Sequence, residues 1–353
     1  MSDLRAALIG YGLAGSVFHA PLIESTRGLT VARVVTANSE RAAQARRELP
    51  AARVLPDPDA VFADPRAQDF VVVATPNDLH APLARRSLAA GLPVVIDKPL
   101  ALNAAEARGL VEAAEDAGLL LVPFLNRRWD SDQLTLRRLL AEGALGSVLR
   151  MESRFERWRP QLGEGRWREQ TSPERGGGVL LDLGAHLIDQ ALQLFGPVEA
   201  VYAEIVSPRG GAADDDAFLA LSHGSGVHSH IWTSAFAAAP GPRLRVLGDR
   251  AAFVVTDLDG QEDALRAGRR PGEGSDWGAE PRERWGSLVS GDRGEPVESA
   301  RGDWPAFYAE LGRALRGEGP PPVDPRDAVH GLEIIDAARR SAAEQRRAAL
   351  GGD

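Results

Sequence analysis

Two side chains that could move a proton stand four residues apart in the middle of the chain, at Asp182 and His186. On a helix, residues at this spacing share a face. A histidine titrates near neutrality and is therefore suited to accept a proton from a hydroxyl group. A bare pair of this kind is most often found on a helix surface, but the three glycines at 176–178 and the apolar neighbours favour a buried pair here.

A lysine is the next candidate for chemistry. Lys98 follows the apolar run 94–96 within Asp97-Lys98-Pro99, and a lysine in such a turn usually belongs to a surface loop. The position of Lys98 argues otherwise, because the carboxyl ends of parallel strands lie at the edge of the sheet where ligands bind. We therefore expect its ammonium group to point into a cofactor crevice.

The crevice itself is indicated by glycines in the pattern G-x-G-x-x-G at Gly10, Gly12 and Gly15. In a dinucleotide-binding turn the first glycine permits a sharp bend, the second lets the backbone approach a pyrophosphate, and the third lets helix and strand pack closely. A helix starting near Leu13 would present the N–H groups of Leu13 and Ala14 to the phosphates. The spacing alone could be an ordinary turn, and its place between a strand and a helix favours the cofactor site.

The residues after the second expected strand, 29–36, bear on the choice of cofactor. A fold that prefers NAD usually places an acid there, whereas this chain has Asn38, Ser39 and Arg41, which can bind a 2′-phosphate. The sequence favours NADP, with NAD as the weaker alternative. In another interpretation Asn38 and Ser39 cap the next helix and Arg41 is a surface charge, and the nearby Glu40 keeps that interpretation open.

A second polar turn follows the apolar run 69–74. It contains Thr75, Asn77 and His80. Because this turn lies at the same carboxyl edge of the predicted sheet, we expect all three residues, together with Lys98, to contact the cofactor.

The elements that must position these side chains alternate as strand and helix up to residue 124, which predicts a parallel sheet covered on both faces. Beyond it, residues 198–255 are rich in short strands, residues 276–302 are polar and irregular, and two amphipathic helices follow at 304–316 and 324–347. The predicted fold class is α/β. It has a Rossmann domain over residues 1–124 and an α+β domain over 125–353 with an open, mainly antiparallel sheet.

Composition excludes several classes of function. The chain of 353 residues is long enough for two domains, and its net charge of −9, with no basic block, argues against nucleic acid as a partner. It has no cysteine, which excludes disulfides, thiolate metal sites and a cysteine nucleophile. No signal peptide and no apolar run near the roughly 20 residues of a membrane span occur, so we expect a cytoplasmic protein with no membrane partner.

Taken together, these motifs resemble the Gfo/Idh/MocA oxidoreductases over nearly the whole chain. Asp97-Lys98-Pro99 matches the family's E-K-P signature with an acid one carbon shorter, and Asp182 to His186 matches its D-x-x-x-H motif. The resemblance implies that Lys98 hydrogen-bonds the reacting oxygen and that His186 is the general base. Asp182 would hold the substrate hydroxyl or orient the imidazole. It implies no metal, and it implies a homodimer or homotetramer formed through the C-terminal sheet.

A narrower resemblance concerns the substrate. Residues 260–271 and 275–278 are similar to a loop of NADP-dependent scyllo-inositol dehydrogenases, as are 126–130 and 166–169. The resemblance implies interconversion of a cyclic polyol, with scyllo-inositol and its inosose as the leading pair. The expected substrate residues are Arg127, Trp158, Arg166, Trp167, Asp276 and Trp277. The aromatic and arginine residues among them could equally belong to a protein interface.

Two alternatives stay open. One is a dehydrogenase of another sugar or polyol, because a widely reused fold does not determine the substrate. The other is a catalytically silent regulator that senses NADP, which the presence of Lys98, Asp182 and His186 together argues against.

Overall fold

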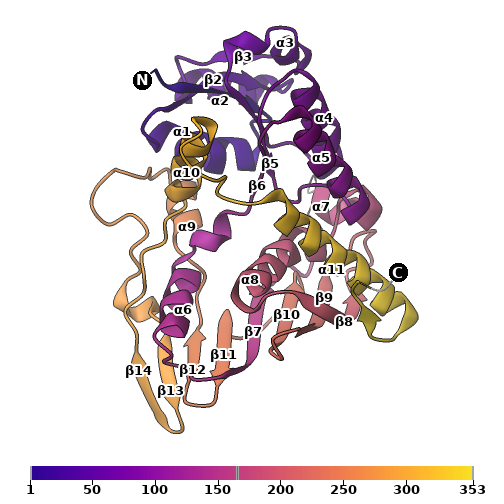
Figure 1. Ribbon diagram of the computed structural model, residues 1–353, viewed down its shortest axis with the longest axis vertical. Helices are drawn as coiled ribbons and strands as arrows, with labels where there is room; N and C mark the ends of the chain where they lie inside the picture. Colours follow the sequence, from indigo (N-terminus) through magenta and orange to yellow (C-terminus); the bar gives the residue numbers. More distant parts are fainter. Residues whose placement is uncertain (1, 164, 166, 352–353) are drawn as a thin grey trace.

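A computed structural model describes residues 2–163, 165 and 167–351. Two sheets dominate it, one near each end of the molecule (Figure 1). Within the described residues the N-terminal sheet has the order β3-β2-β1-β4-β5-β6, and all of its neighbouring strands are parallel. Its strands are β1 (Leu4–Ile9), β2 (Leu29–Val35), β3 (Arg53–Leu55), β4 (Phe70–Val73), β5 (Val94–Asp97) and β6 (Leu121–Phe124). The predicted Rossmann sheet is confirmed.

The helices of this half connect the strands as a parallel sheet requires. They are α1 (Ala20–Ser25), α2 (Ser39–Glu48), α3 (Asp59–Phe62), α4 (His80–Ala89) and α5 (Ala104–Ala117). The strand order reverses at β1, whose neighbours are β2 and β4. Ligands bind outside the carboxyl ends of the strands at such a reversal.

The glycine turn after β1 is dictated by close backbone contacts. Gly10 has φ +103°, and a Cβ there would lie 2.3 Å from the carbonyl oxygen of Ala74. A Cβ on Gly15 would lie 2.1 Å from the carbonyl oxygen of Gly10. The next helix does not start as the regular α-helix expected from Leu13. Residues Ala14–His19 form a π-helical turn, in which an amide reaches the carbonyl five residues back, and α1 continues from it.

The second sheet has the order β14-β13-β12-β11-β7-β10-β9-β8-β15 in the described part of the chain. Only the pair β7 and β10 is parallel among these neighbours, so the expectation of a mainly antiparallel sheet is confirmed. Its strands are β7 (Val148–Glu156), β8 (Val198–Val206), β9 (Asp216–His223), β10 (His228–Ser234), β11 (Leu244–Gly248), β12 (Ala252–Val255), β13 (Ser287–Ser290), β14 (Arg293–Pro296) and β15 (Ala348–Ala349).

The hairpin of β13 and β14 lies in the stretch 276–302, which the sequence predicts to be irregular. That expectation is wrong for residues 287–296, because this edge hairpin is polar and β14 is exposed along its whole length. It therefore lacks the alternation of apolar and polar residues that marks a half-buried strand.

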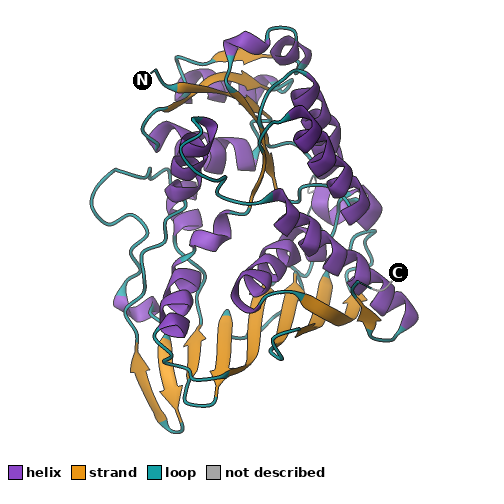
Figure 2. Ribbon diagram, in the orientation of Figure 1, coloured by secondary structure: helices purple, strands orange, loops and turns teal. Residues whose placement is uncertain are grey.

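Helices cover one broad face of the second sheet (Figure 2). The helices of this half are α6 (Ser131–Ala141), α7 (Trp167–Gln170), α8 (Ala185–Phe195), α9 (Gln261–Arg266), α10 (Pro305–Leu315) and α11 (Pro325–Glu344). Among the described residues no helix is both long and apolar enough to cross a bilayer.

The C-terminal helices return to the Rossmann half. Phe307 and Tyr308 of α10 are buried with Phe124 of β6, and the rings of Phe124 and Phe307 meet edge to face at 4.8 Å. Helix α11 packs on both α5 and β8 and so bridges the two sheets (Figure 1). Residue 124 thus ends the Rossmann strands in sequence, while the core beneath them also contains residues from the chain's last fifty.

Candidate active site

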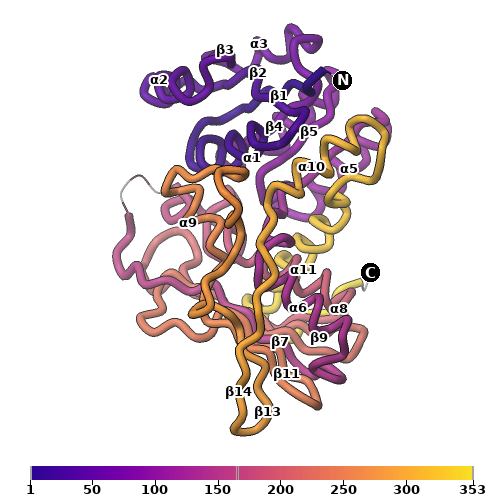
Figure 3. Tube along the Cα trace, turned by 90° about the vertical axis from the view of Figure 1, so that its left-hand side faces the viewer, coloured from indigo at the N-terminus to yellow at the C-terminus, as the bar shows by residue number. Residues whose placement is uncertain are grey.

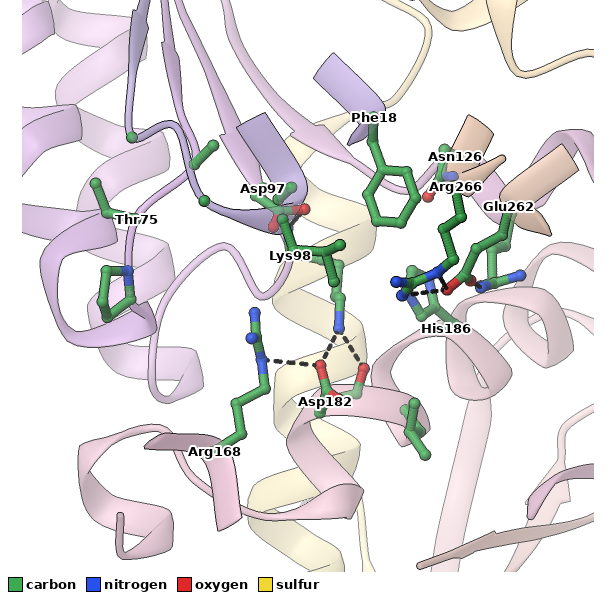
Figure 4. A pocket seen from close by; sticks show the side chains of 18 of the residues that line it. Phe18, Thr75, Asp97, Lys98, Asn126, Arg168, Asp182, His186, Glu262 and Arg266 are labelled. Carbon is green, nitrogen blue, oxygen red and sulfur yellow. Dashed lines mark hydrogen bonds and ion pairs between the residues drawn. The ribbon is translucent and has the colours of Figure 1, made fainter. Parts of the chain in front are cut away.

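One pocket of about 380 Å³ lies between the carboxyl edge of the Rossmann sheet and the second sheet. Figure 4 shows side chains from both halves converging on it. It brings together most of the predicted site residues: Gly10, Gly12, Leu13, Ala14, Arg41, Thr75, Lys98, Arg127, Trp167, Asp182 and His186.

The centre of the pocket is an ion pair between the two sequence motifs. Lys98 Nζ donates to Asp182 Oδ1 at 2.5 Å and also to the main-chain oxygen of Asp182. Arg168 Nε lies 3.2 Å from the same carboxylate (Figure 4). Burial alone would raise the pKa of Asp182, but the charges of Lys98 and Arg168 hold it well below its usual range. Asp182 is therefore ionised throughout the neutral range.

Asp182 lies on an irregular turn. Residues Leu180–Gly184 form a π-helical turn that leads into α8. The carboxylate of Asp214 accepts the N–H of Leu180 at 2.7 Å, and Gly178 has φ +98° with its Cα against that carboxylate, where a Cβ would clash at 1.9 Å. A buried acid and a glycine thus hold the start of the turn, which places Asp182 and His186 on the pocket wall.

His186 is a neutral imidazole in this setting. Burial, followed by the charges of Lys98 and Arg127, lowers its pKa well below the usual value. Its Nδ1 is buried and has no hydrogen-bond partner in the described chain. Between the two expected roles of Asp182, the structure does not place its carboxylate on the imidazole, because the carboxylate bonds Lys98 instead.

The cofactor end of the pocket fits a dinucleotide. A Cβ on Gly12 would meet no atom within 4 Å except the guanidinium of Arg41, so the glycine leaves the backbone open to a pyrophosphate. Asn38 caps α2, since its Oδ1 accepts the N–H of Arg41 at 2.9 Å. Ser39 is exposed at the start of that helix. The capping interpretation thus holds for Asn38, while Arg41 lies over the glycine turn, within the pocket.

Two expected cofactor residues lie behind the pocket wall. His80 is fully buried, and its ring nitrogens lie 2.8 Å and 3.0 Å from the carbonyl oxygens of Pro99 and Thr75. Asn77 is also buried and donates to the carbonyl oxygen of Gly176 at 2.8 Å. Both side chains tie together the loops that form the site, and neither lines the pocket.

Some of the expected substrate residues line the pocket and others do not. Arg127 and Trp167 line the pocket. Trp158 is largely exposed and packs on Phe236. Asp276 pairs with Arg269, and Trp277 donates to Gln261, at a separate small pocket behind α9. Trp158, Asp276 and Trp277 therefore do not line this pocket, because each of them is engaged by partners elsewhere. Arg166 lies outside the described residues.

Comparison with known proteins agrees with this geometry. Residues 4–124 match the family model described as the NAD-binding Rossmann fold of an oxidoreductase family, and residues 137–350 match the model of its C-terminal alpha/beta domain. The chain belongs to the Gfo/Idh/MocA oxidoreductase family. Its N-terminal domain is an NAD(P)-binding Rossmann domain.

Individual members of the Gfo/Idh/MocA family are similar over nearly their whole length. The oxidoreductase YdgJ of Escherichia coli, whose activity is uncharacterised, is 41% identical over 97% of both chains. The scyllo-inositol 2-dehydrogenase (NADP(+)) IolW of Bacillus subtilis is 35% identical over 98% of this chain and 96% of its own. A solved structure of the oxidoreductase yvaA from Bacillus subtilis superposes with a TM-score of 0.92 at 34% identity, covering 99% of each chain.

Several residues that line the pocket of this Gfo/Idh/MocA chain are not among the predicted site residues. Arg157 directly follows β7 and Arg168 lies on α7, while Glu262 and Arg266 come from α9, which lies against the turn after β1 (Figure 3). Arg168, Glu262 and Arg266 lie in stretches that resemble the inositol dehydrogenases as a whole, which does not indicate which side chains point inward, and Arg157 lies outside those stretches.

One compositional signal does single out a site residue. Lys98 is the only lysine in the 353 residues, and the other strongly basic residues are all arginines. Arginine cannot replace it as a compact ammonium donor.

The described residues contain no group of three or more histidine, aspartate or glutamate side chains arranged to hold a metal ion.

Proposed function

We propose that this Gfo/Idh/MocA oxidoreductase is an NADP-dependent dehydrogenase that interconverts a cyclic polyol, with scyllo-inositol as the best candidate, and its ketone. The observation that carries the proposal is the meeting of Lys98, Asp182 and His186 in a pocket whose other end is the dinucleotide turn. The similarity to IolW supports the choice of substrate and of cofactor.

A nicotinamide dinucleotide held at the glycine turn would supply the hydride acceptor for the ring carbon that carries the reacting hydroxyl. His186 takes the hydroxyl proton, which a neutral imidazole can accept. Lys98 donates a hydrogen bond to the reacting oxygen and stabilises the negative charge that develops there. Asp182 keeps the ammonium of Lys98 in place through the bond at 2.5 Å.

Arg41→Ala should weaken NADP binding at least about tenfold and leave NAD binding nearly unchanged, because it removes one charge-assisted contact to the 2′-phosphate. Titration of each cofactor measures the effect. Arg47→Ala, an exposed arginine on the same helix α2, is the matched control and should change neither constant. Equal kcat/KM for NADP and NAD in the unmodified protein would reject the NADP preference.

scyllo-Inositol, with six equatorial hydroxyls, should exceed myo-inositol in kcat/KM by at least roughly tenfold, because one misplaced hydroxyl leaves a buried polar group unpaired. Trp167→Ala should lower kcat/KM for both inositols and reduce the ratio between the two values, since Trp167 lines the pocket. Trp158→Ala, in the segment between β7 and α7 and outside the pocket, should preserve the ratio of the two kcat/KM values. Robust oxidation of glucose with inositols inert would move the proposal to another polyol or sugar.

The regulator hypothesis makes a different prediction. A protein that only senses NADP would bind the cofactor and turn over no polyol with it. Any steady NADPH production from a panel of inositols and aldoses therefore decides against the regulator.

We also propose that the protein is cytoplasmic and that a second copy covers the outer face of the nine-stranded sheet. Phe218 and Trp232 meet on this face at 5.0 Å, with His230 5.8 Å from Phe218. Light scattering should then give a dimer or tetramer, and a monomer at micromolar concentration would reject the assembly.

A further inference from the structure

Positive charge is concentrated where the substrate would bind. A second pocket of about 340 Å³ adjoins the first and shares part of its wall. Basic side chains outnumber carboxylates around the two, although the whole chain carries a net charge of −9. The basic residues that line them are Arg41, Lys98, Arg127, Arg157, Arg159, Arg168, Arg209 and Arg266.

Most of these cations have a carboxylate of the protein beside them. Lys98 and Arg168 share Asp182. Arg127 and Arg266 share Glu262. The remaining pairs, apart from Arg41 at the cofactor end, are those of Arg159 with Glu169 and of Arg209 with Asp215 and Glu169.

Arg157, near Lys98, Asp182 and His186 in the pocket lining, is the exception because it has no such carboxylate partner among the residues that the structure describes. Within the described ranges, no ion pair and no side-chain hydrogen bond engages its guanidinium, and it lines both pockets. The acids whose charges act on the pKa of Arg157, Glu262 and Asp182, are each already paired with two other cations. The guanidinium thus lines the cavity with no direct ion-pair partner in the described part of the chain.

Two backbone hydrogen bonds and a stacking contact hold Arg157 in place. Its N–H donates to the carbonyl oxygen of Ser234 at 2.8 Å, and its own carbonyl oxygen accepts the N–H of Ala237 at 3.0 Å. The guanidinium lies over the ring of Phe155 at 5.1 Å, and the side chain is only partly exposed. Strand pairing and stacking therefore keep the donors at the wall of the cavity.

We propose that Arg157 is an anion-recognising residue of the substrate site, and that this site takes ring polyols carrying a carboxylate as well as neutral ones. A guanidinium without a protein partner matches a carboxylate in both charge and geometry, since the two can form parallel hydrogen bonds. Burial, together with the charge of Arg159, lowers the pKa of Arg157, as expected for a cation that lacks an anion.

The other anion that could meet Arg157 is a phosphate of the cofactor. The place of Arg157 argues for the substrate, because it extends from the end of β7 in the second sheet, while the pyrophosphate turn and Arg41 belong to the Rossmann half. The affinity of an Arg157 variant for NADPH distinguishes a substrate carboxylate from a cofactor phosphate, because only the loss of a phosphate contact would weaken NADPH binding.

The inference rests on the proposed dehydrogenase function only for turnover. An acidic substrate would give hydride from its ring carbon to the nicotinamide and its hydroxyl proton to His186, and the carboxylate would remain unchanged. Binding needs no turnover, so the recognition step can be measured alone.

The test is calorimetric titration of the complex of the full chain with NADPH. The ligands are D-glucuronate and its methyl ester, which differ by one charge at nearly constant shape. We expect glucuronate to bind at least about tenfold more tightly than the ester, as for a charge-assisted contact. In Arg157→Gln the preference should fall to within about twofold, with the affinity for NADPH unchanged, and Arg157→Lys should keep part of the preference.

Arg293→Gln is the control for loss of one positive charge, because Arg293 is exposed on β14 and lines neither pocket. It should bind as the unmodified protein does. No preference for glucuronate in the unmodified protein, or a preference that survives in Arg157→Gln, would overturn the inference. So would a comparable loss of NADPH affinity in both Arg157 variants. If the preference is found while no polyol is oxidised, the proposed function fails and the recognition site stands.

Discussion

His186→Ala should lower kcat for polyol oxidation by about 10²–10⁴-fold, because it removes the group that accepts the hydroxyl proton. NADPH should bind to the variant with its ordinary affinity, since the imidazole lies on α8 and the dinucleotide turn follows β1. Steady-state rates and a fluorescence titration of NADPH measure the two quantities separately.

A matched control is His330→Ala. His330 is exposed on α11 and lines a different pocket, so its loss should leave kcat unchanged. If His186→Ala retained more than about a third of kcat, the loss would be too small for a general base and His186 would have a structural role.

Lys98→Met should lower kcat by about 10²–10³-fold, as expected when one donor to a developing negative charge is removed. Asp182 would still have Arg168 Nε at 3.2 Å, so the substitution does not leave a buried carboxylate without any cation. Thermal unfolding of the variant checks that the fold survives.

The pH profile of the same variant tests the electrostatics. In the unmodified protein the acid limb of kcat/KM for oxidation should lie below the value near 6.5 of an ordinary histidine, because the pKa of His186 is lowered. Lys98 is one of the charges that lower it, after burial. Its removal favours the imidazolium form, raises the pKa of His186 and should move the acid limb to higher pH. A limb that stays in place would show that Lys98 and His186 are not coupled.

The parts of the site that follow from the sequence are those determined by local chemistry or by parallel strand order. Gly10 and Gly15 are required by backbone contacts within the first strand and turn. Lys98 reaches the pocket because the parallel strand β5 ends at the same edge as β1. Asp182 and His186 need only to be close in sequence on one helical segment.

The parts that do not follow depend on where loops pack. Trp158 and Trp167 look equivalent in the sequence, yet only Trp167 faces the pocket, because Trp158 joins Phe236 beside the second sheet. The residues of the stretches 260–271 and 275–278, which resemble the inositol dehydrogenases, also differ in whether they face the pocket. Glu262 of α9 faces the pocket, whereas Trp277 turns to Gln261. No local pattern separates these cases, since the partners lie far away in the chain.

The single lysine also makes the site chemically addressable. Its side chain is 12% exposed and opens on the pocket, so an amine-selective reagent meets only one ε-amine in these 353 residues. Acylation of that nitrogen abolishes its charge, so labelling located at Lys98 by peptide mapping and the loss of turnover report on the same atom. A ligand seated beside Lys98 would shield it from the reagent. Protection from acylation would therefore measure occupancy of the pocket without any need for catalysis.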